Sequence, residues 1–321
     1  MLKKITSLSL ISLCLLVSSC SDNGEQKKLN GNDGRPKIAL IMKSLANEFF
    51  VTMSAGAQAH QLANADKYEL IVNGIKNESD LAQQVRLIDQ MISMGVNAIV
   101  IAPADSKALI PALARVEEAG IVIVNIDNRL DGEILSQYDL TIPFVGPDDF
   151  SGAEMVGNYL AKNINENGKV AILEGIQTAY NSQLRLSGFQ KAMEQNGHTI
   201  VVEQSADWDQ TKAVSITSAI LIQHPDIDAI LCANDNMALG AVAAIRQAGL
   251  SEQVKVVGYD NISAAKDLIL SGDLIATADQ HGGSLAVYGI EYAIEIIKSG
   301  REMPDKLTSV DLITLDILEN K

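Results

Sequence analysis

Short apolar runs rich in isoleucine and valine alternate along most of the chain with longer stretches of helical periodicity. In stretches such as 80–94 and 235–248, apolar residues recur at spacings of three and four, which is typical of amphipathic helices. The short runs are continuously apolar, so we interpret them as strands of parallel sheets buried on both faces. The predicted strands are 37–42, 68–73, 98–102, 121–126, 169–173, 199–203, 229–232, 255–259 and 275–278.

This β–α pattern occurs about twice over. Four units precede Asp127, about four more follow Gly168, and the stretch 131–150 between them interrupts the rhythm with glycine and proline. The pattern predicts an α/β fold with two Rossmann-like parallel-sheet lobes. Two open sheets of similar size place a ligand cleft between them, at the carboxyl ends of their strands.

The N-terminal segment 1–19 has the pattern of a signal peptide. A basic start, MLKK, precedes an apolar run over 5–17, which is too short to span a bilayer. The following sequence VSSC resembles a lipobox, which implies cleavage before Cys20 and attachment of a lipid to it; an ordinary secretory signal is the alternative. Residues 20–35 are polar and predict a flexible tether. We therefore expect a protein held by Cys20 on the periplasmic side of the cell envelope, with no other contact with the membrane.

Composition and charge exclude several classes of function. The formal net charge of −15 over 321 residues argues against nucleic-acid binding. Of the cysteines, Cys14 leaves with the signal peptide and Cys20 carries the lipid, so Cys232 alone remains and forms no intrachain disulfide. The histidines lie far apart, and nucleophile-elbow, P-loop and dinucleotide motifs are absent from the sequence. We expect no enzyme activity, cofactor or metal.

Polar and aromatic side chains collect directly after the predicted strands. Flat aromatic rings can cover the C–H faces of a sugar, and carboxylates, amides and guanidinium groups can each hold two neighbouring hydroxyls. Structural alternatives remain open: Arg185 could hold its loop, Lys43 could pair with Glu48 or Asp127, and Asp235 is assigned to capping or the hinge. The strand-end residues are Lys43, Ser44, Asn47, Phe49, Phe50, Asp127, Asn128, Asn181, Gln183, Arg185, Trp208, Asn234, Asp260 and Gln280.

Several short motifs occur in order along most of the chain: IAL at 38–40 with NEFF at 47–50, NID at 125–127, RLSGF at 185–189, ADWD at 206–209, ANDNMALGA at 233–241 and VVGYD at 256–260. In these motifs the chain resembles the ribose-binding branch of the type I periplasmic binding proteins, which are relatives of the lactose-repressor core. The resemblance implies two lobes joined by a three-strand hinge. We place the N-terminal lobe at 36–146 plus 281–308 and the C-terminal lobe at 147–280 plus 309–321.

The same resemblance implies roles for individual side chains. Phe49 and Phe50 would close over one side of the sugar, and Trp208 would stack on the opposite face. Lys43, Asn128 and Gln183 depart from the ribose pattern, which argues against ribose itself. The side chains implied to bind hydroxyls are those of Asn47, Asp127, Asn234, Asp260 and Gln280, and we also count Lys43, Ser44, Asn128, Gln183 and Arg185 as candidate ligand residues.

We therefore expect a substrate-binding lipoprotein of a sugar ABC importer, a monomer that binds a monosaccharide between its lobes by hinge closure and delivers it to the permease. One alternative is a ligand-binding sensor subunit that docks on a receptor or kinase, and another is an importer subunit for a non-sugar solute such as a polyol. A repressor would need a basic helix-turn-helix before Lys37, where the chain instead has a lipid signal and an acidic tether.

Overall fold

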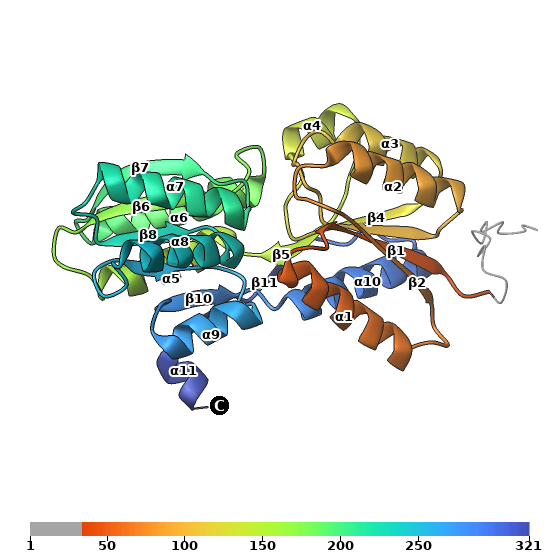
Figure 1. Cartoon of the computed structure of the whole chain (residues 1–321). Coiled ribbons are helices and arrows are strands. Elements are labelled where there is room, and N and C mark those ends of the chain that lie inside the picture. Colours follow the sequence, from red (N-terminus) through yellow and green to blue (C-terminus); the bar gives the residue numbers. More distant parts are fainter. Residues whose placement is uncertain (1–33, 321) are drawn as a thin grey trace, which may run out of the picture.

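The structure, a computed structural model, describes residues 34–320. The chain folds into two lobes connected by segments that pass between them near the centre of Figure 1. The predicted signal peptide and Cys20 lie outside the described residues. No helix in the range 34–320 is long and apolar enough to cross a membrane.

The first lobe is built on a parallel six-stranded sheet whose two faces are both apolar. Ile38 and Leu40 pack with helices α1 (Glu48–Ala63) and α10 (Gly282–Ser299), whereas Ala39 and Ile41 pack with α2 (Leu81–Ser93) and α3 (Ile110–Glu118). Burial on both faces explains why the strands appear in the sequence as continuous apolar runs. The strand order is β11 (Lys306–Thr308), β5 (Phe144–Pro147), β4 (Val122–Ile126), β3 (Ala98–Ile101), β1 (Lys37–Ser44), β2 (Glu69–Ile75), and the short α4 (Gly132–Gln137) follows β4.

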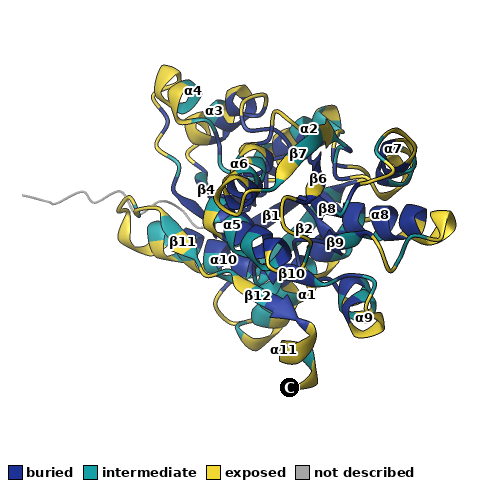
Figure 2. Cartoon of the chain, turned by 90° about the vertical axis from the view of Figure 1, so that its left-hand side faces the viewer, coloured by how far each residue is buried: buried dark blue, intermediate teal, exposed yellow. Residues whose placement is uncertain are grey.

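The second lobe repeats this plan with one difference, because its edge strand β12 runs antiparallel to β10. Figure 2 shows buried central strands such as β8 beside helices whose outer faces are exposed. Cys232 ends a fully buried strand, and burial raises the pKa of its thiol well above the ordinary value. The strand order is β12 (Asp311–Thr314), β10 (Ala276–Asp279), β9 (Lys255–Val257), β8 (Ala229–Cys232), β6 (Lys169–Glu174), β7 (Thr199–Ser205); the helices are α5 (Asp149–Ala161), α6 (Tyr180–Gln195), α7 (Gln210–Gln223), α8 (Asp235–Ala248), α9 (Ser263–Ser271) and α11 (Leu315–Glu319).

The chain passes from one sheet to the other between β5 and α5, between β10 and α10, and between β11 and β12. At the second of these crossings His281 adopts a left-handed backbone with φ of 55°. Its ring Nε2 lies 2.9 Å from Oδ2 of Asp311, just beyond the third crossing. The crossings therefore lie side by side, as a hinge between two lobes requires. The residue limits that we assign to each lobe stay a prediction.

Each predicted strand corresponds to a strand of the structure, whereas β5, β11 and β12 are not predicted by the apolar pattern. These three strands have only three or four residues each. β5 contains Gly146 and Pro147, and Leu307 in β11 is exposed, so neither strand gives the signal of a buried strand.

Candidate functional site

A cavity of about 240 Å³ lies between the two lobes, at the carboxyl ends of the strands of both sheets. Both lobes contribute to its wall. The first lobe supplies Lys43, Phe49, Phe50, Glu78 and Asp127, the second supplies Asn181, Arg185, Trp208, Asn234 and Asp260, and Gln280 comes from the second crossing.

Aromatic rings from the two lobes form the apolar parts of the wall. Phe49 and Phe50 begin α1 and meet edge to face, with ring centroids 5.1 Å apart and planes at 78°. Trp208 precedes α7 and packs directly on Gly175, where an added Cβ would lie 2.0 Å from the indole Cζ2. Phe49 rests on Gly282 in the same way, at 2.6 Å. The two glycines therefore let the rings pack tightly against the backbone.

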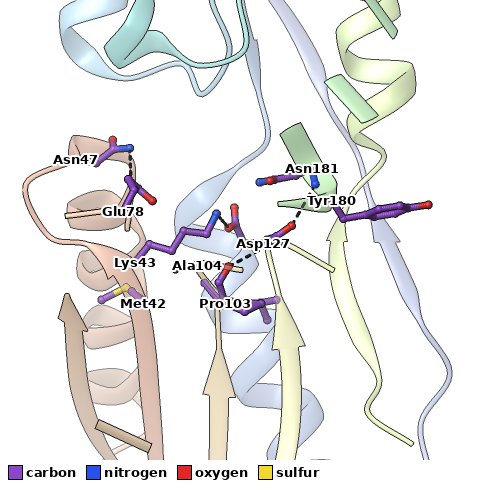
Figure 3. A network of polar contacts seen from close by, with 12 residues as sticks. Met42, Lys43, Asn47, Glu78, Pro103, Ala104, Asp127, Tyr180 and Asn181 are labelled. Atoms are coloured by element: carbon purple, nitrogen blue, oxygen red, sulfur yellow. Dashed lines mark hydrogen bonds and ion pairs between the residues drawn. The ribbon is translucent and has the colours of Figure 1, made fainter. Parts of the chain in front are cut away.

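The polar groups of the first lobe form a buried network at the ends of β1, β2 and β4 (Figure 3). Nζ of Lys43 lies 2.8 Å from Oδ2 of Asp127, and both side chains are almost fully buried. Glu78, on the loop after β2, accepts a hydrogen bond of 3.3 Å from Nδ2 of Asn47. Burial raises the pKa of Glu78 from 4.5 to about 7, although the nearby Lys43 ammonium opposes the rise.

Arg185 organises the polar groups of the second lobe. Its Nε donates to Oδ1 of Asp149 at 2.7 Å, and its Nη1 donates to the carbonyl of Ala233 at 2.9 Å. The guanidinium carbon lies 3.8 Å from the centre of the Tyr259 ring. Burial raises the pKa of Asp149 to about 6 even with this cation beside it. Arg185 therefore lines the cavity and also holds its surroundings, and its contact with a ligand stays a prediction.

Asp260 and Gln280 form the part of the wall nearest the hinge. Nε2 of Gln280 donates to Oδ1 of Asp260 at 2.6 Å, and burial raises the pKa of that carboxyl well above its ordinary value. Asn181 also faces the cavity, and its buried Oδ1 has no hydrogen-bond partner within residues 34–320. Several acceptors therefore converge on one small space.

Three residues of the wall adopt backbone conformations that side chains rarely take. Asp127, Trp208 and Asp260 have φ values of 64°, 63° and 127°. Such residues cluster at functional sites, because the surrounding structure must hold them there at an energetic cost. The strained backbone conformations therefore occur at residues that also line the cavity.

Four of the predicted ligand residues lie outside the cavity wall, and the structure gives each another role. Ser44 donates its hydroxyl to the Lys76 carbonyl, and Asn47 caps α1 by accepting from the amide of Phe49. Asn128 donates to the Pro103 carbonyl, because the left-handed turn at Asp127 directs the next side chain toward that loop. Gln183 is exposed and donates to the Gln177 carbonyl, since α6 turns its side chain away from the cleft.

Two residues of the wall were not predicted as ligand residues. Asn181 is a strand-end amide two positions from Gln183, and it is Asn181 rather than Gln183 that lines the cavity. Glu78 follows the half-buried strand β2, and the rule that polar residues collect after strands could have found it.

At the start of α8 it is Asn234 that caps the helix, accepting from the amide of Met237. Asp235 is instead fully buried and accepts from the hydroxyl of Thr277 at 2.7 Å, so it ties α8 to β10.

The arrangement is suited to holding a small polyhydroxylated molecule. Carboxylates, amides and guanidinium groups accept and donate in pairs, and aromatic rings flank them. The residues 34–320 hold no cluster of histidine, cysteine, aspartate or glutamate suited to a metal ion. Two α/β lobes with a polar cavity between them define the class of solute-binding proteins that close around a ligand.

Known proteins place the chain within this class. Residues 38–302 match the periplasmic binding protein domain, and the chain belongs to this family of solute-binding proteins. Membership places it on the periplasmic side of the cell envelope.

Similar proteins include sugar binders. A D-ribose/D-allose-binding protein of Pseudomonas aeruginosa is 50% identical over 284 residues, covering 87% of this chain and 89% of that protein. The ribose import binding protein of Escherichia coli is 31% identical over 264 residues, covering 81% and 84%. A periplasmic solute-binding protein of Actinobacillus succinogenes, solved with bound D-allose, is 37% identical with a TM-score of 0.85, covering 89% of this chain and 100% of that one.

Proposed function

We propose that this protein is the substrate-binding lipoprotein of a sugar ABC importer and binds a monosaccharide between its lobes. The observation that carries the proposal is the cavity wall, in which both lobes present planar polar groups beside aromatic rings. A ligand makes the full set of contacts only when the lobes are together, so binding favours the closed form. Hydrogen bonds to charged groups of this kind contribute about 1.5–3 kcal/mol each. The chain binds its sugar and performs no catalysis.

The preferred sugars are aldoses of the D-allose and D-ribose type. Relatives named for these two sugars support the choice. Lys43, Asn128 and Gln183 are the residues that depart from the ribose pattern. Because Asn128 and Gln183 lie outside the cavity wall, only Lys43 still argues for a sugar other than ribose.

A thermal-shift screen of aldoses, ketoses and polyols tests this proposal. A ligand present at about 100 times its dissociation constant adds about 2.7 kcal/mol to the free energy of unfolding. We expect D-allose or D-ribose to raise the melting temperature. The proposal is wrong if no sugar does so while an amino acid or a purine nucleoside does.

Two substitutions connect the binding to this cavity. Trp208→Ala removes a ring from the wall, and Asp127→Asn removes a charge while keeping a residue type that tolerates a φ of 64°. Each variant should lose sugar binding in calorimetry and keep the circular dichroism of the wild type. Gln183→Ala is the matched control, because this side chain is exposed and outside the wall.

The remaining parts of the proposal concern location and partners. Cleavage before Cys20 would leave a lipid anchor and a tether over 20–35, with the closed lobe tips facing the permease and the protein acting as a monomer. Cys20→Ser should abolish the incorporation of labelled palmitate that the wild type shows. Absence of label from the wild type, or equal labelling of Cys20→Ser, would contradict the lipid anchor while leaving the sugar proposal intact.

A further inference from the structure

Helices α6 and α9 of the second lobe begin at residues whose side chains cannot cap them. The N-cap residue of α6 is Ala179 and that of α9 is Ile262, and neither offers a side-chain acceptor. The first amides of a helix have no partner within it, and a serine, threonine, aspartate or asparagine usually caps them. Helices α5, α7 and α8 of the same lobe follow this rule, with Asp148, Asp209 and Asn234 as caps.

The first lobe supplies the cap of α6 from across the cleft. The amide of Tyr180 donates to Oγ of Ser106 at 2.9 Å, and the amide of Asn181 donates to Oδ1 of Asn128 at 3.1 Å. Both acceptors are buried. Nδ2 of Asn128 donates to the Pro103 carbonyl within the first lobe at 3.0 Å, which fixes its Oδ1 toward α6. The acceptors are therefore held in place by their own lobe.

Glu48, at the start of α1 in the first lobe, supplies the cap of α9. Its Oε1 accepts from the amide of Ser263 at 2.8 Å and also from the Ser263 hydroxyl. Burial alone would raise the pKa of Glu48, but hydrogen bonds from Ser263 and Ala264 hold it below the ordinary value. A carboxylate at a helix N-terminus also interacts favourably with the helix dipole. Helices α6 and α9 thus both receive their caps from the opposite lobe.

We propose that Ser106, Asn128 and Glu48 are positioning residues for ligand binding, which cap α6 and α9 only when the lobes are closed. When the lobes separate, the first amides of α6 and α9 no longer reach these acceptors and bond to water instead. The caps therefore stabilise the closed form, and none of the three residues lines the cavity. The apparent affinity for a ligand falls in proportion to the closed fraction, so the caps set affinity without touching the ligand. This inference rests on the proposed function.

The test compares Ser106→Ala and Glu48→Ala with the wild type by calorimetry with D-allose and D-ribose. Loss of a helix cap corresponds to about a fivefold change in an equilibrium constant. We expect each variant to bind about fivefold more weakly, and the double variant about 25-fold, because the two caps serve separate helices. Glu48→Gln keeps an acceptor and should recover part of the affinity. Glu133→Ala is the control, since Glu133 is an exposed first-turn acid of α4.

A cap placed within α6 separates closure from simple stabilisation. Ala179→Ser should give the amides of α6 an acceptor in the open and closed forms alike, which removes the advantage of closing. We expect Ala179→Ser to weaken sugar binding while preserving the melting temperature of the unliganded protein, and Ser106→Ala to have little further effect in that background. A merely structural role of Ser106 predicts the opposite, with full sugar affinity in Ala179→Ser.

Closure itself can be measured without a sugar. Single-molecule energy transfer between labels on exposed positions of α2 and α7 should show a closed fraction about fivefold smaller in Ser106→Ala and in Glu48→Ala. Wild-type affinity together with a wild-type closed fraction in both variants overturns the inference. If the wild type binds no sugar, the sugar proposal fails, and the closed fractions still decide whether the caps act on closure.

Discussion

The Glu78 carboxyl gives the protein a stability that depends on pH in a defined direction. Glu78 lies on the cavity wall, and burial raises its pKa from an ordinary value of 4.5 to about 7. The Lys43 ammonium and the hydrogen bond from Asn47 lower this pKa, while the Asp127 carboxylate raises it. The charged form is therefore disfavoured in the folded protein relative to the unfolded chain.

The sign and size of the effect follow from proton linkage. Between pH 4.5 and about 7 the folded protein binds more protons at Glu78 than the unfolded chain does, so the free energy of unfolding falls as the pH rises through this window. Above pH 7 both states are ionised and the loss is complete. At about 1.4 kcal/mol for each tenfold change in proton affinity, the loss amounts to about 3 kcal/mol.

Glu78→Gln removes this proton site and keeps an oxygen that can accept from Asn47. We expect the variant to be more stable than the wild type by up to about 3 kcal/mol at pH 8, and nearly equal to it at pH 5. Urea denaturation of both proteins from pH 5 to pH 8 measures the difference, in which the contributions of other buried carboxyls cancel. Glu133→Gln, an exposed control, should show no such trend. A difference of constant size at all pH values would refute the reasoning.

Three further substitutions probe the second lobe. Arg185→Met leaves Asp149 buried without its cation and should lower the free energy of unfolding by about 3–5 kcal/mol in urea denaturation. The double variant Arg185→Met with Asp149→Leu should regain most of this stability, and a loss below about 1 kcal/mol for the single variant would contradict a buried pair. Gly175→Ala should displace the Trp208 indole and lower the free energy of unfolding by about 1–3 kcal/mol. It should also weaken sugar binding at least tenfold in calorimetry, and full affinity would show that the position of the indole is unimportant. Asn234→Ala should lower the free energy of unfolding by about 1 kcal/mol because it removes the cap of α8, whereas Asn234→Ser keeps a capping oxygen and should not. Equal melting temperatures for the two variants would count against the cap.

The two sheets are predictable from sequence because most of their strands are buried on both faces. β8 is completely apolar and matches its predicted range, whereas the antiparallel edge strand β12 is half exposed and has no such pattern. The contrast is sharper within the site. Asp127 and Asn128 are equivalent in the sequence, as adjacent polar residues after β4, yet one lines the cavity and the other faces Pro103. A single left-handed residue decides between them, and this conformation cannot be read from residue type.

The route of the chain between the sheets also constrains how the protein is made. The first lobe contains β1 to β5 from the early part of the chain, but α10 and β11 reach it only after the whole second sheet except β12 has been synthesised. Leu285, Ile290 and Ala293 of α10 cover one face of the first sheet. A ribosome-bound chain that ends before them exposes this apolar face.

Domains usually fold as units, with the N-terminal one first during synthesis. Here neither sheet can be completed until β11 and β12 have been synthesised, because each of these strands forms one edge of a sheet. Completion of both lobes is therefore delayed until residue 314 has been synthesised, and the growing chain stays available to chaperones and to the export machinery up to that point.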